Sequence, residues 1–481
     1  MGKVFIKNAK AIVTCDAQDQ VFYNCDLLID GPKLISVGTV IEPDDPRILG
    51  AKVIDASGMF IYPGLVNTHH HFFQTFVRNL TTIDYPNLTV MDWIDQIYRI
   101  FQKIDDQVIF YSSLTAMADL LKHGCTTAFD HQYCYTTFTG KRPVDRQMEA
   151  ARLLGIRYHA GRGGNTLPRE KGSSIPQPMV ESTDEFIKDC QRLIETYHDS
   201  SAYSMRQIVI APCQPINCYR DTFVESVKLA RDMGVRLHTH LGEGESEGIK
   251  ERYGKRTLEW CQDIGFIGPD VFYAHAWELT PEEYKMIADT GTGISHCPAP
   301  AVLGGFPILN IKQLMDMGIC ISLGCDGSAT NDSSNLLDTL RMAYLMQAWH
   351  TKARGGCVTA YDLLKAATIN GAKTLGRPDL GSLEVNKGAD LFMVDTRGLE
   401  LTGALHDPKN ILARGGLTGP VWMTMVNGKV VYQDGRLMGV DEERLAREGE
   451  IVCSKVLRNS FSEYWKYGAL ILILRRAIKA S

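Results

Sequence analysis

Seven of the thirteen histidines in this chain stand at four places whose pattern is typical of a metal site. The first place is the triplet 69–71, and the second is His238-Thr239-His240 with Glu243 three residues beyond it. Alternate side chains of a strand share a face, so the first and third residues of each cluster can point the same way. Neutral imidazoles with one carboxylate suit Zn²⁺ or Fe²⁺. We therefore expect a divalent metal ion, with Zn²⁺ favoured over Fe²⁺.

Three further candidate metal-binding or acid–base residues follow short apolar segments. His275 ends Tyr273-Ala274-His275, His296 precedes Cys297-Pro298, and Asp326 stands in Cys325-Asp326-Gly327. In a barrel of parallel strands the carboxyl ends converge on one face, where active sites lie. The signatures HExxH, GxSxG and GxGxxG are absent from the sequence. We interpret Cys297 as a small buried residue rather than as a nucleophile.

The middle of the chain alternates apolar strand candidates with helical segments. Helical spacing is found at 111–122, 222–233 and 336–349. The strand candidates end near Asn67, Asp130, Gly161, Pro212, His240, His275, His296 and Asp326. Eight such units suit a (β/α)₈ barrel. A doubly wound open sheet alternates in the same way, so periodicity leaves both architectures open.

Both ends of the chain are rich in short strands. Residues 1–61 and 385–440 carry apolar runs broken by Gly and Asp, which predict a small antiparallel sheet. Asn427-Gly428 favours a type I′ hairpin. We predict one β-domain built from both ends, a barrel over 62–384, and a charged helical segment over 441–481 outside the barrel. The apolar run 468–474 is interpreted as a buried or interface helix.

Composition excludes several classes of protein. The 481 residues carry a net charge of −5, which argues against a nucleic-acid binder. No stretch approaches the roughly 20 apolar residues of a membrane span, and the first residues lack the apolar run of a signal peptide. The thirteen cysteines are scattered without a disulfide framework. We expect a cytoplasmic protein with reduced thiols, no nucleic-acid partner and no membrane partner.

These clusters together resemble the amidohydrolase superfamily. The matching segments are 63–71, 124–127, 237–243, 274–275, 296–298 and 325–327. The family fold is an α/β (β/α)₈ barrel with a small β-sandwich formed by both termini, so the resemblance decides between barrel and open sheet. The fourth strand, 207–212, lacks the lysine that bridges two metals in binuclear members. The resemblance is therefore to the aminohydrolase branch with one metal.

The resemblance implies roles for six residues. Glu243 is implied as the acid–base residue, and His275 as the partner of the attacking water. Asp326, besides binding the metal, would pass a proton to the departing amine. The implied metal ligands are His69, His71, His240 and Asp326.

Two groups within that branch are similar to this chain. Segments 69–75 and 326–335 resemble 8-oxoguanine deaminases and hydroxyatrazine ethylaminohydrolases, and segments 129–133 and 274–278 lean toward the second group. We expect hydrolytic deamination of an aminated N-heterocycle, such as 8-oxoguanine or a guanine-like purine, to the lactam and ammonia. The alternatives are amine release from an s-triazine, hydrolysis of a cyclic amide, or a scaffold without activity, which the intact ligand set disfavours. The deaminases often have a polar loop where this chain has the apolar segment Ala299-Pro300-Ala301. The identity of the heterocyclic substrate therefore stays undecided.

Five residues are candidates for substrate contacts, each with a plainer alternative. Gln74 is predicted to hydrogen-bond the edge of the substrate ring, and the alternative is a structural hydrogen bond within its loop. Trp93 is predicted to stack on the substrate ring, and the alternative is packing in the hydrophobic core. Arg162 and Glu278 are predicted to contact polar ring atoms, with an ion pair and a solvated carboxylate as the alternatives. His296 is predicted to bind substrate or to brace the metal site. A homodimer or higher homo-oligomer is expected from the fold family.

Overall fold

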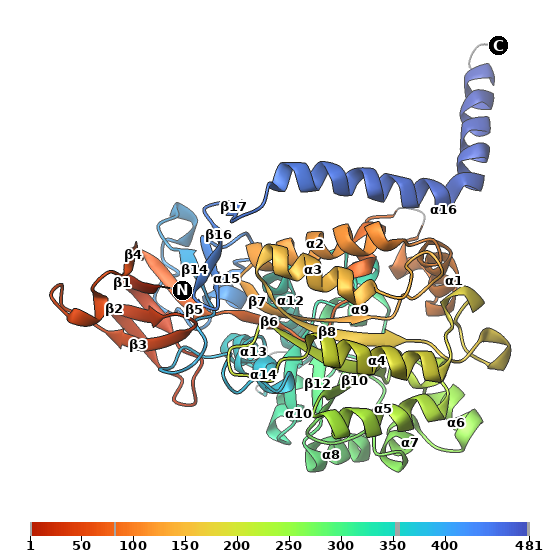
Figure 1. The fold of residues 1–481 in the computed structure, drawn as a ribbon, viewed down its shortest axis with the longest axis horizontal. Helices are drawn as coiled ribbons and strands as arrows, with labels where there is room; N and C mark the ends of the chain where they lie inside the picture. Colours follow the sequence, from red (N-terminus) through yellow and green to blue (C-terminus); the bar gives the residue numbers. More distant parts are fainter. Residues whose placement is uncertain (1, 81–82, 352–355, 479–481) are drawn as a thin grey trace.

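The structure is a computed structural model that describes residues 2–80, 83–351 and 356–478, and the side chains of all of these except 90, 91 and 461–478. Two separate sheets organise the chain, one in a barrel and one in a smaller domain beside it (Figure 1). This confirms the predicted fold class of a (β/α)₈ barrel with a strand-rich domain built from both termini.

Eight strands form the barrel, and neighbouring strands along the chain pair in parallel. They are β6 (Leu65–Asn67), β7 (Cys125–Gln132), β8 (Arg157–Gly164), β9 (Arg206–Pro212), β10 (Arg236–Leu241), β11 (Val271–His275), β12 (Gly293–His296) and β13 (Cys320–Leu323). The first and last strands meet where the backbone N–H of Thr68 donates to the carbonyl of Leu323 at 3.1 Å. That contact excludes the open-sheet alternative.

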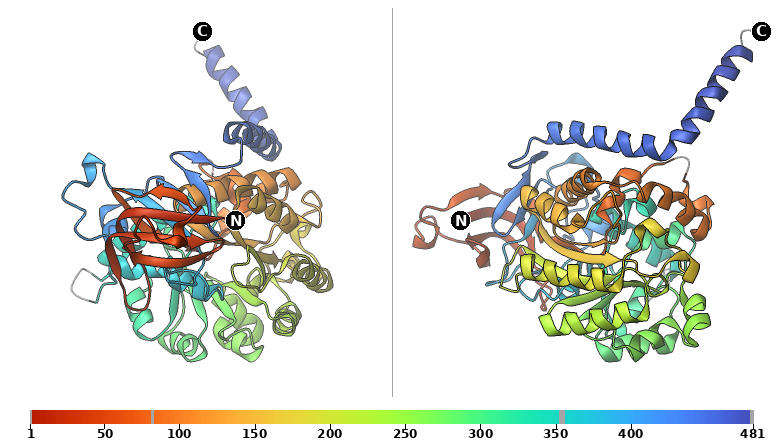
Figure 2. Two further views of the ribbon diagram at one scale, coloured as in Figure 1. Left: turned by 60° about the vertical axis from the view of Figure 1, so that its left-hand side comes forward. Right: turned by 45° about the vertical axis from the view of Figure 1, so that its right-hand side comes forward.

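Helices cover the outside of the barrel (Figure 2). The longer ones are α2 (Asp106–Lys122), α3 (Pro143–Leu154), α4 (Thr183–Tyr197), α5 (Arg220–Met233), α8 (Pro281–Thr290) and α12 (Leu336–His350). Shorter ones are α7 (Thr257–Asp263), α10 (Ile311–Asp316), α13 (Ala360–Ala366), α14 (Ile369–Thr374) and α15 (Ile411–Gly415). The connections after the strands carry two 3₁₀ helices, η2 (Phe72–Val77) and η3 (Tyr85–Asn87). They also carry the α-helices α1 (Val90–Phe101), α6 (Ser246–Tyr253), α9 (Pro298–Leu303) and α11 (Ser328–Asn331).

The second sheet combines the two ends of the chain. Its strands are β1 (Lys3–Val13), β2 (Val21–Asp30), β3 (Lys33–Thr39), β4 (Lys52–Asp55), β5 (Met59–Pro63), β14 (Leu391–Asp395), β15 (Met423–Val426), β16 (Lys429–Gln433) and β17 (Arg436–Leu437). Most neighbouring strands of this sheet pair in antiparallel fashion, as expected, whereas β1 pairs in parallel with β4 and β5. The predicted hairpin at Asn427-Gly428 is confirmed, with both residues at positive φ as a type I′ turn requires.

A buried ion pair joins the two sheets. Arg157 begins β8 of the barrel, and its guanidinium makes two hydrogen bonds, of 3.0 and 3.1 Å, to the carboxylate of Asp390 just before β14. The same carboxylate accepts from the backbone N–H of Asn427 at 2.6 Å. Both charged side chains are almost fully buried. The domain of the two termini is therefore fixed to the barrel by a paired charge rather than by apolar contact alone.

The last helix, α16 (Glu442–Ile478), begins outside the barrel. Its first part lies on α2, where Tyr111 donates to Glu448 at 2.9 Å and Lys122 pairs with Glu442 (Figure 1). The side chains of the apolar run 468–474 lie outside the described residues. Among the residues that the structure describes, no helix is both long and apolar enough to span a membrane.

Candidate metal and acid–base site

Three histidines and one aspartate meet at the carboxyl ends of the barrel strands. His69 and His71 follow β6, His240 lies on β10, and Asp326 follows β13. One carboxylate oxygen of Asp326 is 3.4 Å from Nε2 of His69 and 3.2 Å from Nε2 of His71, while the Nε2 atoms of His71 and His240 are 3.1 Å apart. The structure therefore brings together the whole set that the resemblance implied.

Backbone carbonyls fix the orientation of two of these rings, those of His71 and His240. His71 donates from Nδ1 to the carbonyl of His131 at 2.9 Å, and His240 donates to the carbonyl of Cys213 at 2.7 Å. With both Nδ1 atoms carrying the proton, the Nε2 atoms of His71 and His240, which lie 3.1 Å apart, both keep a free lone pair. Such fixed rings are what a metal ion requires of its histidine ligands.

His69 is oriented by another histidine. His238 donates from Nδ1 to the carbonyl of Phe272 at 2.9 Å, so its Nε2 can only accept. That atom lies 3.0 Å from Nδ1 of His69, which must then carry the proton. Nε2 of His69 is left buried, without a hydrogen-bond partner among the described residues. A buried lone pair of this kind fits a divalent cation, since an orphaned polar atom is otherwise costly.

Burial sets the charge of the ligands. It lowers the pKa of His69 to about 4 and lowers that of His240 well below its ordinary value, so both rings are neutral near pH 7. Burial alone would raise the pKa of Asp326, but the neighbouring imidazoles of His69 and His71 lower it well below the usual range. Neutral imidazoles beside an ionised carboxylate are the donor set that Zn²⁺ or Fe²⁺ prefers.

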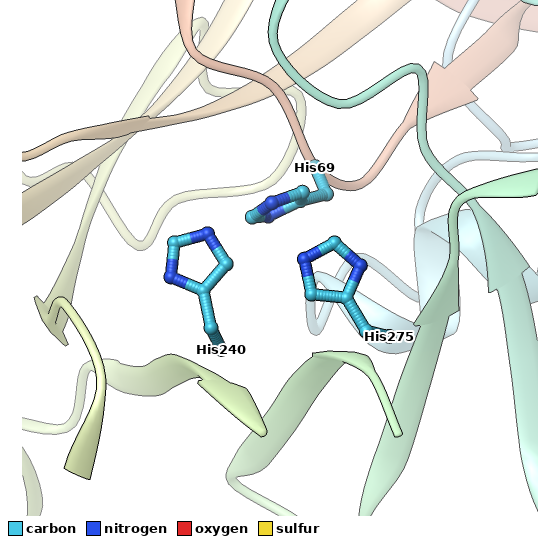
Figure 3. A group of neighbouring side chains, drawn as sticks. All are labelled: His69, His240 and His275. Carbon is cyan, nitrogen blue, oxygen red and sulfur yellow. The ribbon is translucent and has the colours of Figure 1, made fainter. Parts of the chain in front are cut away.

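Glu243 and His275 stand beside this cluster. The carboxylate of Glu243 is 3.5 Å from Nε2 of His275, and 26% of the Glu243 side chain is exposed. The rings of His69, His240 and His275 face one another from three different strand ends (Figure 3). Neither ring nitrogen of His275 has a hydrogen-bond partner in the described part of the chain. His275 thus presents free polar atoms to the space between the ligands and Glu243.

The pKa values of these two residues suit proton transfer. Burial, followed by the charges of Asp326, Glu245 and Glu278, raises the pKa of Glu243 well above its ordinary value. Burial lowers the pKa of His275 to about 3, so its ring is neutral. A carboxyl group with a raised pKa can exchange a proton near neutral pH, as a general acid–base residue must.

Two of the predicted substrate contacts, Gln74 and Trp93, pack or hydrogen-bond within the protein. The amide of Gln74 donates to Tyr133 at 3.1 Å and accepts from the backbone N–H of Ala329 at 3.3 Å. Trp93 packs edge-to-face on Tyr85 with ring centres 5.3 Å apart, inside an apolar cluster. Both arrangements correspond to the plainer alternatives, a braced loop and a packed core residue.

Arg162 is not brought to the histidine cluster. Residues 161 and 163 of β8 face the barrel interior, where an added Cβ would meet Phe129 and His131, so Arg162 faces the outer helices. Its guanidinium makes ion pairs with Glu181 and Asp189. Arg162 therefore forms ion pairs, the alternative to a substrate contact, because the pleat of the strand turns its side chain away from the barrel axis.

Glu278 and His296 lie at the ends of neighbouring strands. The carboxylate of Glu278 accepts from the backbone N–H of Gly244 at 2.9 Å, so it holds the loop that carries Glu243. His296 is fully buried, and both its ring nitrogens lack hydrogen-bond partners among the described residues. Two of the five predicted substrate contacts therefore keep polar atoms without a partner among the described residues, namely His296, which ends the strand next to that of His275, and Trp93 at its indole nitrogen.

Sequence reasoning missed several residues that shape the site. His131 and Cys213 act through backbone carbonyls, which no residue pattern can indicate. The alternation in His238-Thr239-His240 did indicate that His238 can face the cluster, but its contact with Nδ1 of His69 was not predicted. Tyr133 packs edge-to-face on His71 with ring centres 4.9 Å apart, and Glu245 hydrogen-bonds the loop of Glu243.

Comparison with known proteins assigns the family. A model of the amidohydrolase family matches residues 60–431, which cover the whole barrel and, in the second sheet, the strands β14 and β15. The chain belongs to the amidohydrolase family. It is therefore an enzyme, a hydrolase that acts on carbon–nitrogen bonds other than peptide bonds. The suspected superfamily is confirmed.

Three relatives of this amidohydrolase illustrate the range of the family. The chain is 47% identical to hydroxydechloroatrazine ethylaminohydrolase of Pseudomonas sp. (strain ADP), over 93% of this chain and 94% of that protein. It is 32% identical to 8-oxoguanine deaminase of Pseudomonas aeruginosa, over 92% and 96%. Among solved structures, atrazine chlorohydrolase from Arthrobacter aurescens TC1 complexed with zinc superposes with a TM-score of 0.89 at 30% identity, over 94% and 100%.

Proposed function

We propose that this amidohydrolase uses one divalent metal ion, Zn²⁺ before Fe²⁺, to hydrolyse the bond between a ring carbon of an N-heterocycle and its exocyclic amine. The observation that carries the proposal is the convergence of His69, His71, His240 and Asp326 beside Glu243 and His275. The zinc bound by a structural neighbour supports the choice of metal. When bound, such an ion lowers the pKa of a water molecule toward neutrality.

The residues around the ligands then share the proton transfers. Glu243 takes a proton from the attacking water and delivers it to a ring nitrogen of the substrate. His275 orients the water and stabilises the charge that develops at the attacked carbon. Asp326 takes the second proton of the attacking water and passes it to the departing amine, which leaves with the electron pair of the broken carbon–nitrogen bond. The products are a lactam and a free amine.

Two substrate classes fit this chemistry. The sequence favoured an oxopurine such as 8-oxoguanine, with ammonia as the product, and the 32% identity to a deaminase of that compound supports it. The 47% identity to an ethylaminohydrolase favours a hydroxylated s-triazine that releases an alkylamine. The apolar, buried segment Ala299-Pro300-Ala301 at the start of α9 agrees with a substrate that carries an alkyl group.

The test is amine release by purified protein of known metal content. The panel contains hydroxyatrazine, 8-oxoguanine, guanine, isoxanthopterin and 5′-deoxyadenosine, and mass spectrometry identifies both products. We expect turnover of hydroxyatrazine or an oxopurine with about one metal ion per chain. Cleavage of a cyclic amide by metal-loaded protein that releases amine from none of these rings would refute the proposal.

A further inference from the structure

The loop that carries Glu243 is held by two other carboxylates. Glu245 accepts from the backbone N–H groups of Gly242 and Glu243, each at 2.7 Å, one with each of its carboxylate oxygens. Glu278 accepts from the next N–H, that of Gly244, at 2.9 Å. Three consecutive backbone donors, in a loop with positive φ at both glycines, are thus saturated by two acidic side chains.

Glu245 is placed to act on this loop rather than on its own helix. It occupies the N-cap position of α6, yet its side chain makes no capping hydrogen bond and turns back to residues 242 and 243. Its side chain is almost fully buried. A buried carboxylate that accepts two charge-assisted hydrogen bonds is a strong and directional tether.

The same loop is joined to the backbone that carries His275. The carbonyls of Leu241 and Gly242 accept from the N–H groups of Ala276 and Glu278, at 2.8 and 3.2 Å. His275 and Ala276 both have positive φ, an unfavourable conformation for residues with side chains that surrounding contacts must enforce. Residues 241–245 and 275–278 therefore form one hydrogen-bonded unit with Glu243 and His275 on it.

We propose that Glu245 is a positioning residue that sets the distance between Glu243 and His275, with Glu278 closing the same loop. The proposal rests on the acid–base role of Glu243 in the proposed function. Glu245 touches neither the metal ligands nor the reacting atoms, so its loss lowers the rate of proton transfer while metal binding persists. A misplacement of the acid–base group by a fraction of an ångström is enough to slow such a step.

The test compares Glu245→Gln and Glu245→Ala with the control Glu247→Gln, an exposed residue on α6. Glutamine keeps one acceptor oxygen and alanine keeps none. We expect kcat to fall roughly tenfold in Glu245→Gln and roughly a hundredfold in Glu245→Ala, with KM and metal content within about twofold of the parent. Glu247→Gln keeps the parent kcat. A parent-like kcat in Glu245→Gln, or an equal loss of metal and activity, would overturn the proposal.

A second readout does not depend on any substrate. Hydrogen exchange of the amides in segment 242–244 becomes faster in Glu245→Gln than in the parent, and stays unchanged in Glu247→Gln. If the parent enzyme hydrolyses none of the rings tested, the proposed function fails, while this exchange still reports whether Glu245 holds the loop. Unchanged exchange in Glu245→Gln contradicts the positioning role.

Discussion

At the scale of single residues, the site depends on which nitrogen of each imidazole carries the proton. Three separate acceptors, the carbonyls of His131 and Cys213 and the ring of His238, hold the outer nitrogens of the ligands. The inner nitrogens are therefore free lone pairs before any ion arrives. The metal site is built into the barrel rather than assembled by the ion.

Glu243→Gln should separate metal binding from catalysis. Glutamine has nearly the same shape but cannot carry the proton, so we expect kcat to fall about 10²–10⁴-fold with metal content unchanged. The measurement is kcat together with elemental analysis of the purified variant. A parent-like rate would remove Glu243 from the acid–base role.

His240→Ala should lose the metal itself. Removing one of four ligands leaves an incomplete set, so we expect metal content to fall from about one per chain to a small fraction, together with activity. His406→Ala is the control, because His406 is an exposed histidine outside the cluster and its loss should leave the metal content unchanged. Full metal occupancy in His240→Ala would exclude His240 as a ligand.

The sequence indicated a metal site because the two-residue spacing of histidines at expected strand ends lets them share a face. The resemblance to the amidohydrolase family then implied which four residues are the ligands, and the structure places His69 and His71 just after β6 rather than in it. The partners of the ligands were not predictable, since a backbone carbonyl has no residue signature. Arg162 shows the remaining limit: its place near a strand end was correct, but the pleat that turns it outward depended on the exact register of β8.

At the scale of elements, strand ends position the site through short links. Asp326 was expected to end the last strand, but β13 ends at Leu323 and Asp326 takes φ 62°, which turns its carboxylate into the barrel mouth. The segment η2 after the first ligands is held to β7 by Asp130. That carboxylate accepts from the backbone N–H of Phe72 at 2.5 Å and from Gln147 at 2.8 Å.

Asp130 should make stability depend on pH. Burial raises its pKa to about 7 from an ordinary value of 3.8, so the folded protein holds this proton more tightly than the unfolded chain. Unfolding then releases a proton between about pH 4 and pH 7, and the free energy of unfolding falls as pH rises through that range, by at most about 4 kcal/mol.

The variant Asp130→Asn lacks this titration. Its free energy of unfolding relative to the parent should therefore increase between about pH 4 and pH 7, measured by urea denaturation at several pH values. Curves for the two proteins that stay parallel over this range would show that Asp130 does not titrate in it.

At the scale of the whole molecule, one buried ion pair connects the barrel with the sheet of the two termini. Arg157 and Asp390 are 233 residues apart in sequence and almost fully buried together. Neither could be paired from the sequence, because the contact exists only once both ends of the chain have joined the same sheet. The pair explains how strands outside the barrel stay fixed to it.

Asp390→Asn should destabilise the protein strongly. It leaves the guanidinium of Arg157 buried without a counter-charge, which costs about 3–5 kcal/mol. Asp395→Asn is the control, since Asp395 forms an exposed pair with Arg397 and should contribute no more than about 1 kcal/mol. Urea midpoints measure both, and equal midpoints for the two variants would contradict the role of the buried pair.

The central claim is that water replaces an exocyclic amine at a ring carbon. It is tested by turnover of the best substrate of the panel in water labelled with heavy oxygen, followed by mass spectrometry of both products. The account predicts an intact ring that carries one heavy oxygen atom, and a free amine that carries none. A ring-opened product that retains its exocyclic nitrogen would contradict it and identify the enzyme as a cyclic-amide hydrolase.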